Sequence, residues 1–191
     1  MGSLGIVVVI GFVLAIVAVV IVIGMYNALV KARAHVRESW SNVDTELQRR
    51  HDLIPNLVST VKGYASHEKD LLERVVALRE KAESLRPGDA TGEQMAVESE
   101  LGSVLGQLSV RLEAYPDLKA SDNFKQLQTE LAHTEDRVQQ ALRYYNANVR
   151  VYNVKIESVP TNIIAGMFNF ELAEHFELKD EAARDAPKVA F

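Results

Sequence analysis

The stretch LGIVVVIGFVLAIVAVVIVIGMY, residues 4–26, contains no charged side chain, and the first one in the chain is Lys31. At about 1.5 Å per helical residue, these 23 residues reach roughly 34 Å, which exceeds the ~30 Å hydrocarbon core of a bilayer. We therefore expect a transmembrane helix from Leu4 to Tyr26, with residues 1–26 forming a membrane anchor.

A cleaved secretory signal is the main alternative for this segment. Such signals combine a positive N-terminal region, an apolar core of about 7–15 residues and a cleavage site of small residues. Here residues 1–3 carry no positive side chain, the apolar core is longer, and Ala32-Arg33-Ala34 lies beyond Lys31 in an expected helix. The chain has no cysteine to carry a lipid. The pattern favours a retained single-pass anchor.

The charges beside the anchor predict its orientation. Lys31, Arg33 and Arg37 follow the apolar segment, and no basic side chain precedes it. Because basic residues stay on the cytoplasmic side, the N-terminus is expected outside and the bulk of the chain in the cytoplasm. The same three side chains are candidate contacts with the membrane surface.

Composition is consistent with one domain beyond the anchor and argues against nucleic acid as a partner. The absence of cysteine excludes disulfides and thiol chemistry. Residues 27–86 contain 11 Lys and Arg against 9 Asp and Glu, whereas residues 87–191 contain 10 against 17. A nucleic-acid-binding domain needs a basic patch, and the distal half of this chain is acidic.

Apolar residues recur at alternating spacings of four and three from Val36 to Tyr64, which is one face of a long amphipathic helix. The spacing does not slip at Pro55, so we expect a helix kinked near 51–55, with the His51 carbonyl free to accept another donor. The same spacing continues to Leu85. This leaves open one very long helix or a break near 63–67, and Gly63 favours the break.

Two further helices complete the pattern. The Pro- and Gly-containing run 86–92 precedes a third helix whose apolar face extends from Val97 to Tyr115, and Pro116-Asp117 is expected to end it. A fourth helix, capped by Ser121 or Asp122, is expected to run to Pro160. The fold class is therefore all-α: an N-terminal transmembrane helix continuous with a four-helix antiparallel bundle over residues 27–160. A long antiparallel coiled-coil hairpin is the alternative.

Residues 161–191 are expected to form a C-terminal tail. Its apolar run 163–170 is too short to span a membrane. It can dock on the bundle, bind a partner, or enter the membrane interface, and the lack of Lys and Arg in the run favours docking on the bundle.

Several motifs together resemble the LemA family of bacterial membrane proteins. They are Tyr26-Asn27-x-Leu29-Val30, Trp40-Ser41-Asn42-Val43-Asp44, Leu47-x-Arg49-Arg50-x-Asp52-Leu53-Ile54-Pro55-Asn56-Leu57-Val58, Val61-Lys62-Gly63-Tyr64-Ala65-x-His67-Glu68, Tyr144-Tyr145-Asn146, Tyr152-Asn153, Pro160-x-Asn162-Ile163-Ile164-Ala165 and Phe168-x-Phe170. The resemblance covers nearly the whole chain from the anchor onward. It implies an N-terminal membrane helix followed by a helical bundle, and it carries over no catalytic residue.

Motifs for catalysis, metals or cofactors are weak. Glu130-x-x-His133 matches one half of a di-iron motif, but such sites need a second copy and two further glutamates. His67-Glu68 begins like a zinc-protease motif, but Leu71 stands where the second histidine belongs. We therefore predict no catalytic residue, no metal and no cofactor.

The most suggestive polar cluster consists of Arg49, Arg50, His51, Asp52 and Asn56. Arg50 lies on the apolar face, where it can bind an acidic partner, a lipid headgroup or a carboxylate ligand. The alternative, which we favour, is an internal ion pair with Asp44, Glu46 or a glutamate of the fourth helix, because an unpaired buried charge is costly.

These observations predict a membrane-anchored, non-catalytic protein with a scaffold, assembly or interaction role, whose partners are the lipid bilayer, further copies of itself and unidentified membrane proteins. Gly11-x-x-x-Ala15 in the anchor is a spacing that permits close helix contact. The alternative is a membrane-anchored sensor or adaptor that binds a small ligand or an acidic partner near Arg50.

Overall fold

A computed structural model describes residues 2–65, 68–86 and 90–176, and within them all regular structure is helical. This confirms the predicted all-α class. The helices are α1 (Ser3–Lys62), α2 (Lys69–Leu85), α3 (Gly92–Leu112), α4 (Pro116–Ala120), α5 (Asp122–Glu157) and α6 (Thr161–Met167).

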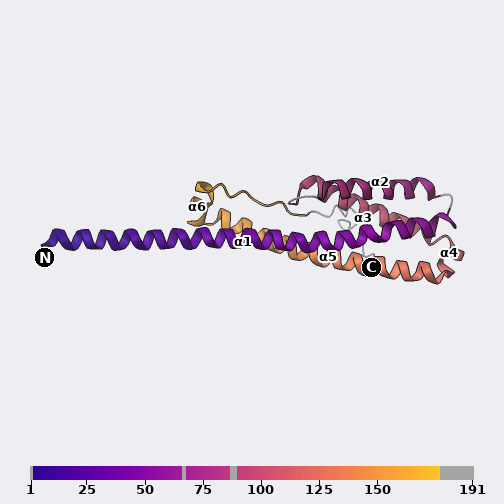
Figure 1. Ribbon diagram of the computed structural model, residues 1–191, viewed down its shortest axis with the longest axis horizontal. Coiled ribbons are helices and arrows are strands. Elements are labelled where there is room, and N and C mark those ends of the chain that lie inside the picture. The colour runs from indigo at the N-terminus through magenta and orange to yellow at the C-terminus, as the bar shows by residue number, and fades with distance from the viewer. Residues whose placement is uncertain (1, 66–67, 87–89, 177–191) are drawn as a thin grey trace, which may run out of the picture.

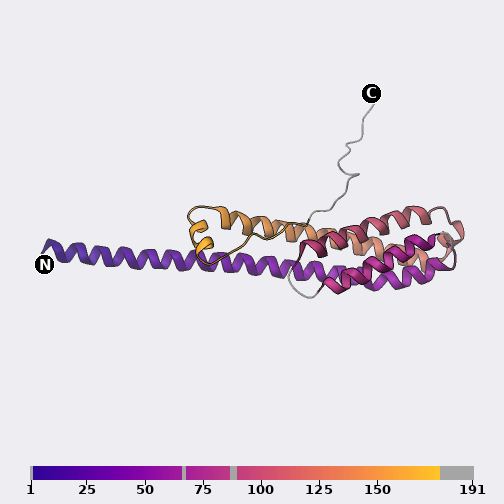
Figure 2. The same cartoon turned by 90° about the horizontal axis from the view of Figure 1, so that it is seen from above.

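The apolar segment and the first bundle helix form one helix. α1 contains 60 residues, including Pro55, and is therefore about 90 Å long. Its first part projects alone from the bundle (Figures 1 and 2). The large aliphatic side chains from Ile6 to Ile23 are exposed to the surroundings there.

The four longer bundle helices alternate in direction along the chain. α1 and α5 lie side by side over most of the length of α5, while α2 and α3 pack on each other at the end far from the N-terminus (Figures 1 and 2). Residues 36–85 were expected to form either one very long helix or two helices with a break near 63–67. The second alternative is correct, because α1 ends at Lys62 and α2 begins at Lys69.

Pro116 does not have the predicted role. α3 already ends at Leu112, and Pro116 begins the five-residue helix α4. The first position of a helix suits proline, since its missing N–H would have no helical partner there and its φ is already helical. Ser121 is the N-cap of α5, but its side chain makes no capping hydrogen bond.

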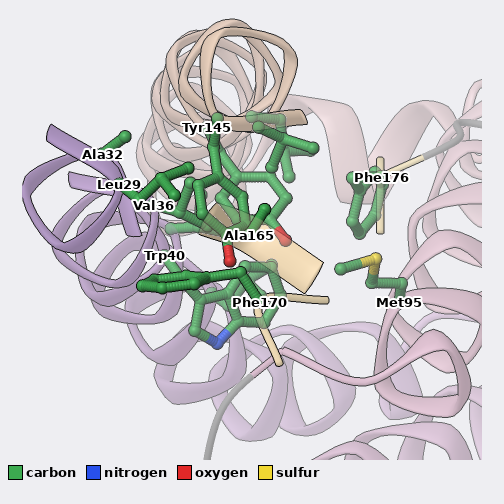
Figure 3. Close-up of a cluster of buried hydrophobic side chains, with 14 of the residues drawn as sticks. Leu29, Ala32, Val36, Trp40, Met95, Tyr145, Ala165, Phe170 and Phe176 are labelled. Carbon is green, nitrogen blue, oxygen red and sulfur yellow. The ribbon is translucent and has the colours of Figure 1, made fainter. Parts of the chain in front are cut away.

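The buried side chains form two clusters along the bundle. The cluster nearer the anchor is built from α1, α3, α5, α6 and the segment that follows α6 (Figure 3). Trp40 and Tyr145 belong to this cluster, and their ring centroids are 5.2 Å apart. The second cluster fills the far end, where α2, α3 and α4 meet α1 and α5.

The chain after α6 is held to α5 by two asparagine side chains. Asn153 donates to the carbonyl of Ala173 and accepts from its N–H, both at 2.9 Å. Asn146 makes the same pair of bonds with the backbone of Phe176, at 3.0 and 2.9 Å. Tyr145 adds a hydrogen bond from its hydroxyl to the Glu174 carbonyl at 2.9 Å. Residues 161–176 therefore pack on the bundle; the rest of the predicted tail lies outside the described residues.

Candidate functional site: a buried ion cluster beside a groove

The five polar residues singled out on α1 separate onto two sides of the helix. Arg50 and His51 are buried, whereas Arg49, Asp52 and Asn56 are exposed. Arg49 contacts Glu46 at 3.3 Å, and Asp52 accepts a hydrogen bond from Gln48 at 2.6 Å. The structure thus brings together two of the five, and the other three lie on the outer face.

Arg50 makes the internal ion pair that the sequence favoured, and one of its partners comes from the predicted helix. Its Nη1 donates to Glu135 of α5 at 3.2 Å. Its Nη2 donates to the carboxylate of Glu98 on α3 at 2.5 Å and to the Glu98 carbonyl at 3.2 Å. Charge-assisted bonds of this kind are stronger than neutral ones.

Two of the predicted partners of Arg50 are engaged elsewhere. Asp44 accepts two hydrogen bonds of 2.8 Å from Arg86, which tie the end of α2 to α1. Glu46 pairs with Arg49 along α1. Glu98 takes the place of these two residues as the buried partner.

His51 shares the Glu98 carboxylate with Arg50. Its Nε2 lies 3.0 Å from Oε1 and 3.3 Å from Oε2 of Glu98, and the hydrogen-bond geometry is met at Oε2. All three side chains are almost completely buried. Because a carboxylate only accepts, the proton lies on Nε2 of His51.

Opposing influences act on the acidity of Glu98. Burial is the largest of them and would raise its pKa, because it disfavours the charged form. The hydrogen bonds and charges of His51 and Arg50 together outweigh burial, so the pKa of Glu98 is lowered. Glu98 is therefore a buried carboxylate held in its charged form.

The carbonyl of His51 receives the donor that Pro55 cannot supply. A helical residue at position 55 would normally donate its N–H to this oxygen, and proline has none. Nε of Arg79 on α2 donates to it instead at 3.0 Å. The prediction that this carbonyl accepts a bond from outside the helix is confirmed, and the bond joins α2 to α1.

A groove between α3 and α5 opens beside this cluster. It consists of two adjoining hollows of about 350 Å³ each, which share Arg50, Gly102 and Glu135 in their walls. The first hollow is lined about equally by polar and apolar surface, and the second is lined mainly by apolar side chains such as Leu105 and Phe124. Arg50 thus contributes to the wall of an open groove while it is paired inside the bundle.

Glu98 is the functional candidate that sequence reasoning missed. It follows Val97, which belongs to the expected apolar face of α3, and precedes the buried Leu101 by three positions. Gln94 lies four residues earlier and is also buried. The available signal was a polar pair at helical spacing beside an apolar face.

The remaining candidates are exposed or lie apart. Glu130 and His133 are exposed on α5, and His67 is outside the described residues. In the ranges the structure describes, no group of three His, Asp or Glu side chains is arranged to hold a metal. Near the anchor, Lys31 and Arg37 are exposed, while the guanidinium of Arg33 lies 4.9 Å from the Phe170 ring centre.

Comparison with known protein families identifies the family of this chain. The family model described as the LemA family matches residues 39–191, which is more than half of the chain. This chain belongs to the LemA family. The match includes the Arg50, His51 and Glu98 cluster and the segment after α6, and it begins after the apolar part of α1.

Named relatives agree with this LemA assignment. Protein LemA of Metamycoplasma hominis is 28% identical over 143 residues, which cover 75% of this chain and 64% of that protein. Magnetosome protein MamQ 2 of Paramagnetospirillum magneticum is 27% identical over 201 positions, covering 93% of this chain and 73% of that protein. Magnetosome protein MamQ of Magnetospirillum gryphiswaldense is 27% identical, with 86% and 68% covered. None of these names describes an enzyme activity, and with the apolar helix they indicate a membrane-associated helical protein.

Proposed function

We propose that this chain is a single-pass, non-catalytic scaffold of the bacterial cytoplasmic membrane, with its N-terminus outside and its bundle in the cytoplasm. The observation that carries the proposal is the uninterrupted helix α1, which runs from the apolar segment into the bundle core. A scaffold must hold its binding surfaces in a fixed place. A continuous helix fixes the height and direction of the bundle relative to the bilayer, which a flexible linker would not do.

The basic side chains support the proposed orientation. Lys31 and Arg37 are exposed within about three helical turns of Tyr26, on the side of the anchor where the bundle lies. Basic residues near a span favour the cytoplasmic side and attract anionic headgroups. Acidic residues close to the anchor, such as Glu38, carry less weight in setting its orientation.

The exposed anchor supports the proposed assembly into oligomers. A Cβ added at Gly11 would meet no atom within 4 Å, so the face that carries Gly11 and Ala15 is open to a second anchor helix. We expect the full-length protein to run as an oligomer in mild detergent, measured by light scattering after size exclusion. Gly11→Leu should lower the mass to that of a monomer, because a large side chain keeps the helix backbones apart.

The matched control for this experiment is Val13→Leu, which enlarges a side chain on the opposite side of the same helix and should leave the mass unchanged. A monomeric wild-type protein would contradict the assembly role. An oligomer insensitive to Gly11→Leu would place the contact between copies outside this face of the anchor.

A second candidate function is the binding of a carboxylate ligand or an acidic partner in the groove beside Arg50. It is favoured by the open hollows and by the Nε of Arg50, which is buried and has no hydrogen-bond partner in the described part of the chain. Glu98 already balances the charge of Arg50, so a ligand would have to replace Glu135, whose side chain is 44% exposed. The scaffold role therefore ranks first.

Succinate is a suitable probe of this second candidate. If the groove binds carboxylates, succinate should raise the melting temperature of the full-length protein by a few degrees. Gly102→Val should abolish the rise, because its side chain would fill the groove where an added Cβ already lies 3.4 Å from Arg50 Nη1. Arg50→Ala is a poorer test, since it leaves the Glu98 carboxylate buried without its partner. No rise in the wild-type protein would remove this candidate.

A further inference from the structure

The last described helix packs one face on the bundle and leaves large apolar side chains exposed. Ile164 and Ala165 of α6 are buried, and Phe170 after it is buried as well. The exposed fractions of Ile163, Met167 and Phe168 are 61%, 68% and 50%. Three large apolar side chains thus gather on a single short helix and the residue that follows it. Such a concentration of exposed apolar side chains marks a contact with another apolar phase.

This exposed face lies where α1 leaves the bundle. α6 is the part of the bundle nearest to the bare apolar stretch of α1 (Figures 1 and 2). Tyr26 marks the end of that stretch, and its ring centre lies 4.8 Å from that of Phe168 and 5.8 Å from that of Phe170. The apolar surface of α6 is therefore continuous with the apolar surface of α1, which ends in the exposed Ile23.

The surrounding residues fit the boundary layer of a bilayer. Aromatic and basic side chains concentrate at the level of lipid headgroups, where an apolar body and a polar tip are both accommodated. Tyr26, Phe168 and Phe170 supply the rings, and Arg33 lies over Phe170. The exposed Glu157 and Glu171 nearby offset part of the basic charge, so apolar contact is the main attraction.

We propose that Ile163, Met167 and Phe168, together termed the membrane foot, enter the interface of the same bilayer that α1 crosses. The occupant of this surface is lipid, because a helix spanning at residues 4–26 places α6 beside the membrane at all times. The inference rests on the proposed membrane anchoring. A single spanning helix can rotate about its axis and tilt, and the foot adds a second contact to one side of that axis. It thereby fixes the rotation of the bundle about the axis of α1, and with it the face of the bundle that lies toward the membrane.

The absence of native cysteine allows this inference to be tested on the full-length chain. Met167→Cys, labelled with the fluorophore bimane, is compared with Val110→Cys carrying the same label. Val110 is a matched control, because it is 70% exposed and lies near the end of α3, far from α6. Both proteins are placed in vesicles of phosphatidylcholine and phosphatidylglycerol that contain a lipid with a nitroxide near its headgroup.

We expect the Met167→Cys label to emit at shorter wavelength and to lose emission several-fold to the nitroxide lipid, while the Val110→Cys label does neither. Equal quenching of the two labels would overturn the inference. A blue shift without quenching would also overturn it, since the label would then be covered by protein. Ile163→Cys repeats the measurement and guards against a local disturbance by the Met167 substitution.

A third label separates this inference from the proposed anchoring. Val13→Cys lies in the middle of the apolar segment and should be quenched by a lipid with its nitroxide deep in the acyl chain. If the Val13→Cys label is quenched and the Met167→Cys label is not, the proposed membrane contact of the foot is wrong, whereas the proposed anchoring by α1 is supported. If Val13→Cys is not quenched, the membrane anchoring itself fails.

Discussion

Replacing Glu98 with alanine is expected to lower the free energy of unfolding of the bundle by about 3–5 kcal/mol. The carboxylate is the buried partner of both Arg50 and His51, and all three side chains are almost completely buried. Without it, the guanidinium of Arg50 stays inside the bundle with only the peripheral Glu135 opposite. The measurement is chemical unfolding of the full-length protein in detergent, followed by circular dichroism.

Glu135→Ala is the matched control for Glu98→Ala. It removes a carboxylate from the same guanidinium, but the Glu135 side chain is 44% exposed, so water screens its contribution. We expect a loss of about 0–1 kcal/mol, as for surface ion pairs. The double substitution Arg50→Met with Glu98→Leu should be much less harmful than Glu98→Ala, because it leaves no unpaired charge on either residue. Equal losses for Glu98→Ala and Glu135→Ala would contradict this account of the cluster.

The pH dependence of stability follows from the same residue. The pKa of Glu98 is lower in the folded protein than its ordinary value of 4.5, so the unfolded chain binds its proton more readily. The stabilisation from Glu98 is therefore fully present above pH 4.5 and is lost as the pH falls below it, through the folded pKa. Glu98→Gln should flatten the stability curve in this acid range and leave its shape near neutral pH unchanged.

The helical period predicted much of this fold. Val43, Leu47 and Ile54 on α1, and Leu142 and Val149 on α5, are buried at the spacings that the sequence shows. The burial of these positions can be predicted from each helix separately, because the apolar face of an amphipathic helix packs against the protein core. The internal pairing of Arg50 was predicted by the same reasoning, since a charge on that face needs a partner.

The identity of the main partner could not be predicted in this way. Asp44 and Glu46 are near Arg50 in sequence, whereas Glu98 is 48 residues away on a helix whose rotation is fixed only by packing. The hydrogen bonds from Asn146 and Asn153 to the backbone after α6 could not be predicted from the sequence for a related reason. It depends on an extended segment lying along α5, and a segment without helical or strand periodicity gives no signal of where it lies.

Pro55→Ala is expected to raise the free energy of unfolding by about 2 kcal/mol. A proline inside a helix destabilises the folded protein by about 3 kcal/mol, so its removal is favourable. The unfolded chain is more flexible with alanine than with proline, which reduces the gain in stability by up to about 1 kcal/mol. Pro55 is exposed, so the smaller side chain leaves no cavity. The alanine N–H can also donate to the His51 carbonyl, four residues earlier. The measurement is again chemical unfolding in detergent.

This substitution should also change the importance of Arg79. In the wild-type protein Arg79→Met removes the external donor to the His51 carbonyl and should cost about 1–3 kcal/mol, the range for a buried polar group left unpaired. In the Pro55→Ala protein the carbonyl has a helical donor, so the same substitution should cost clearly less. Arg74→Met is the control, because Arg74 pairs with the half-exposed Glu100 and should behave alike in both backgrounds. If Arg79→Met costs the same with proline and with alanine at position 55, the bond does not compensate for the proline. Arg79 would then act only through its contact with Glu83, which lies 2.8 Å from its Nη2.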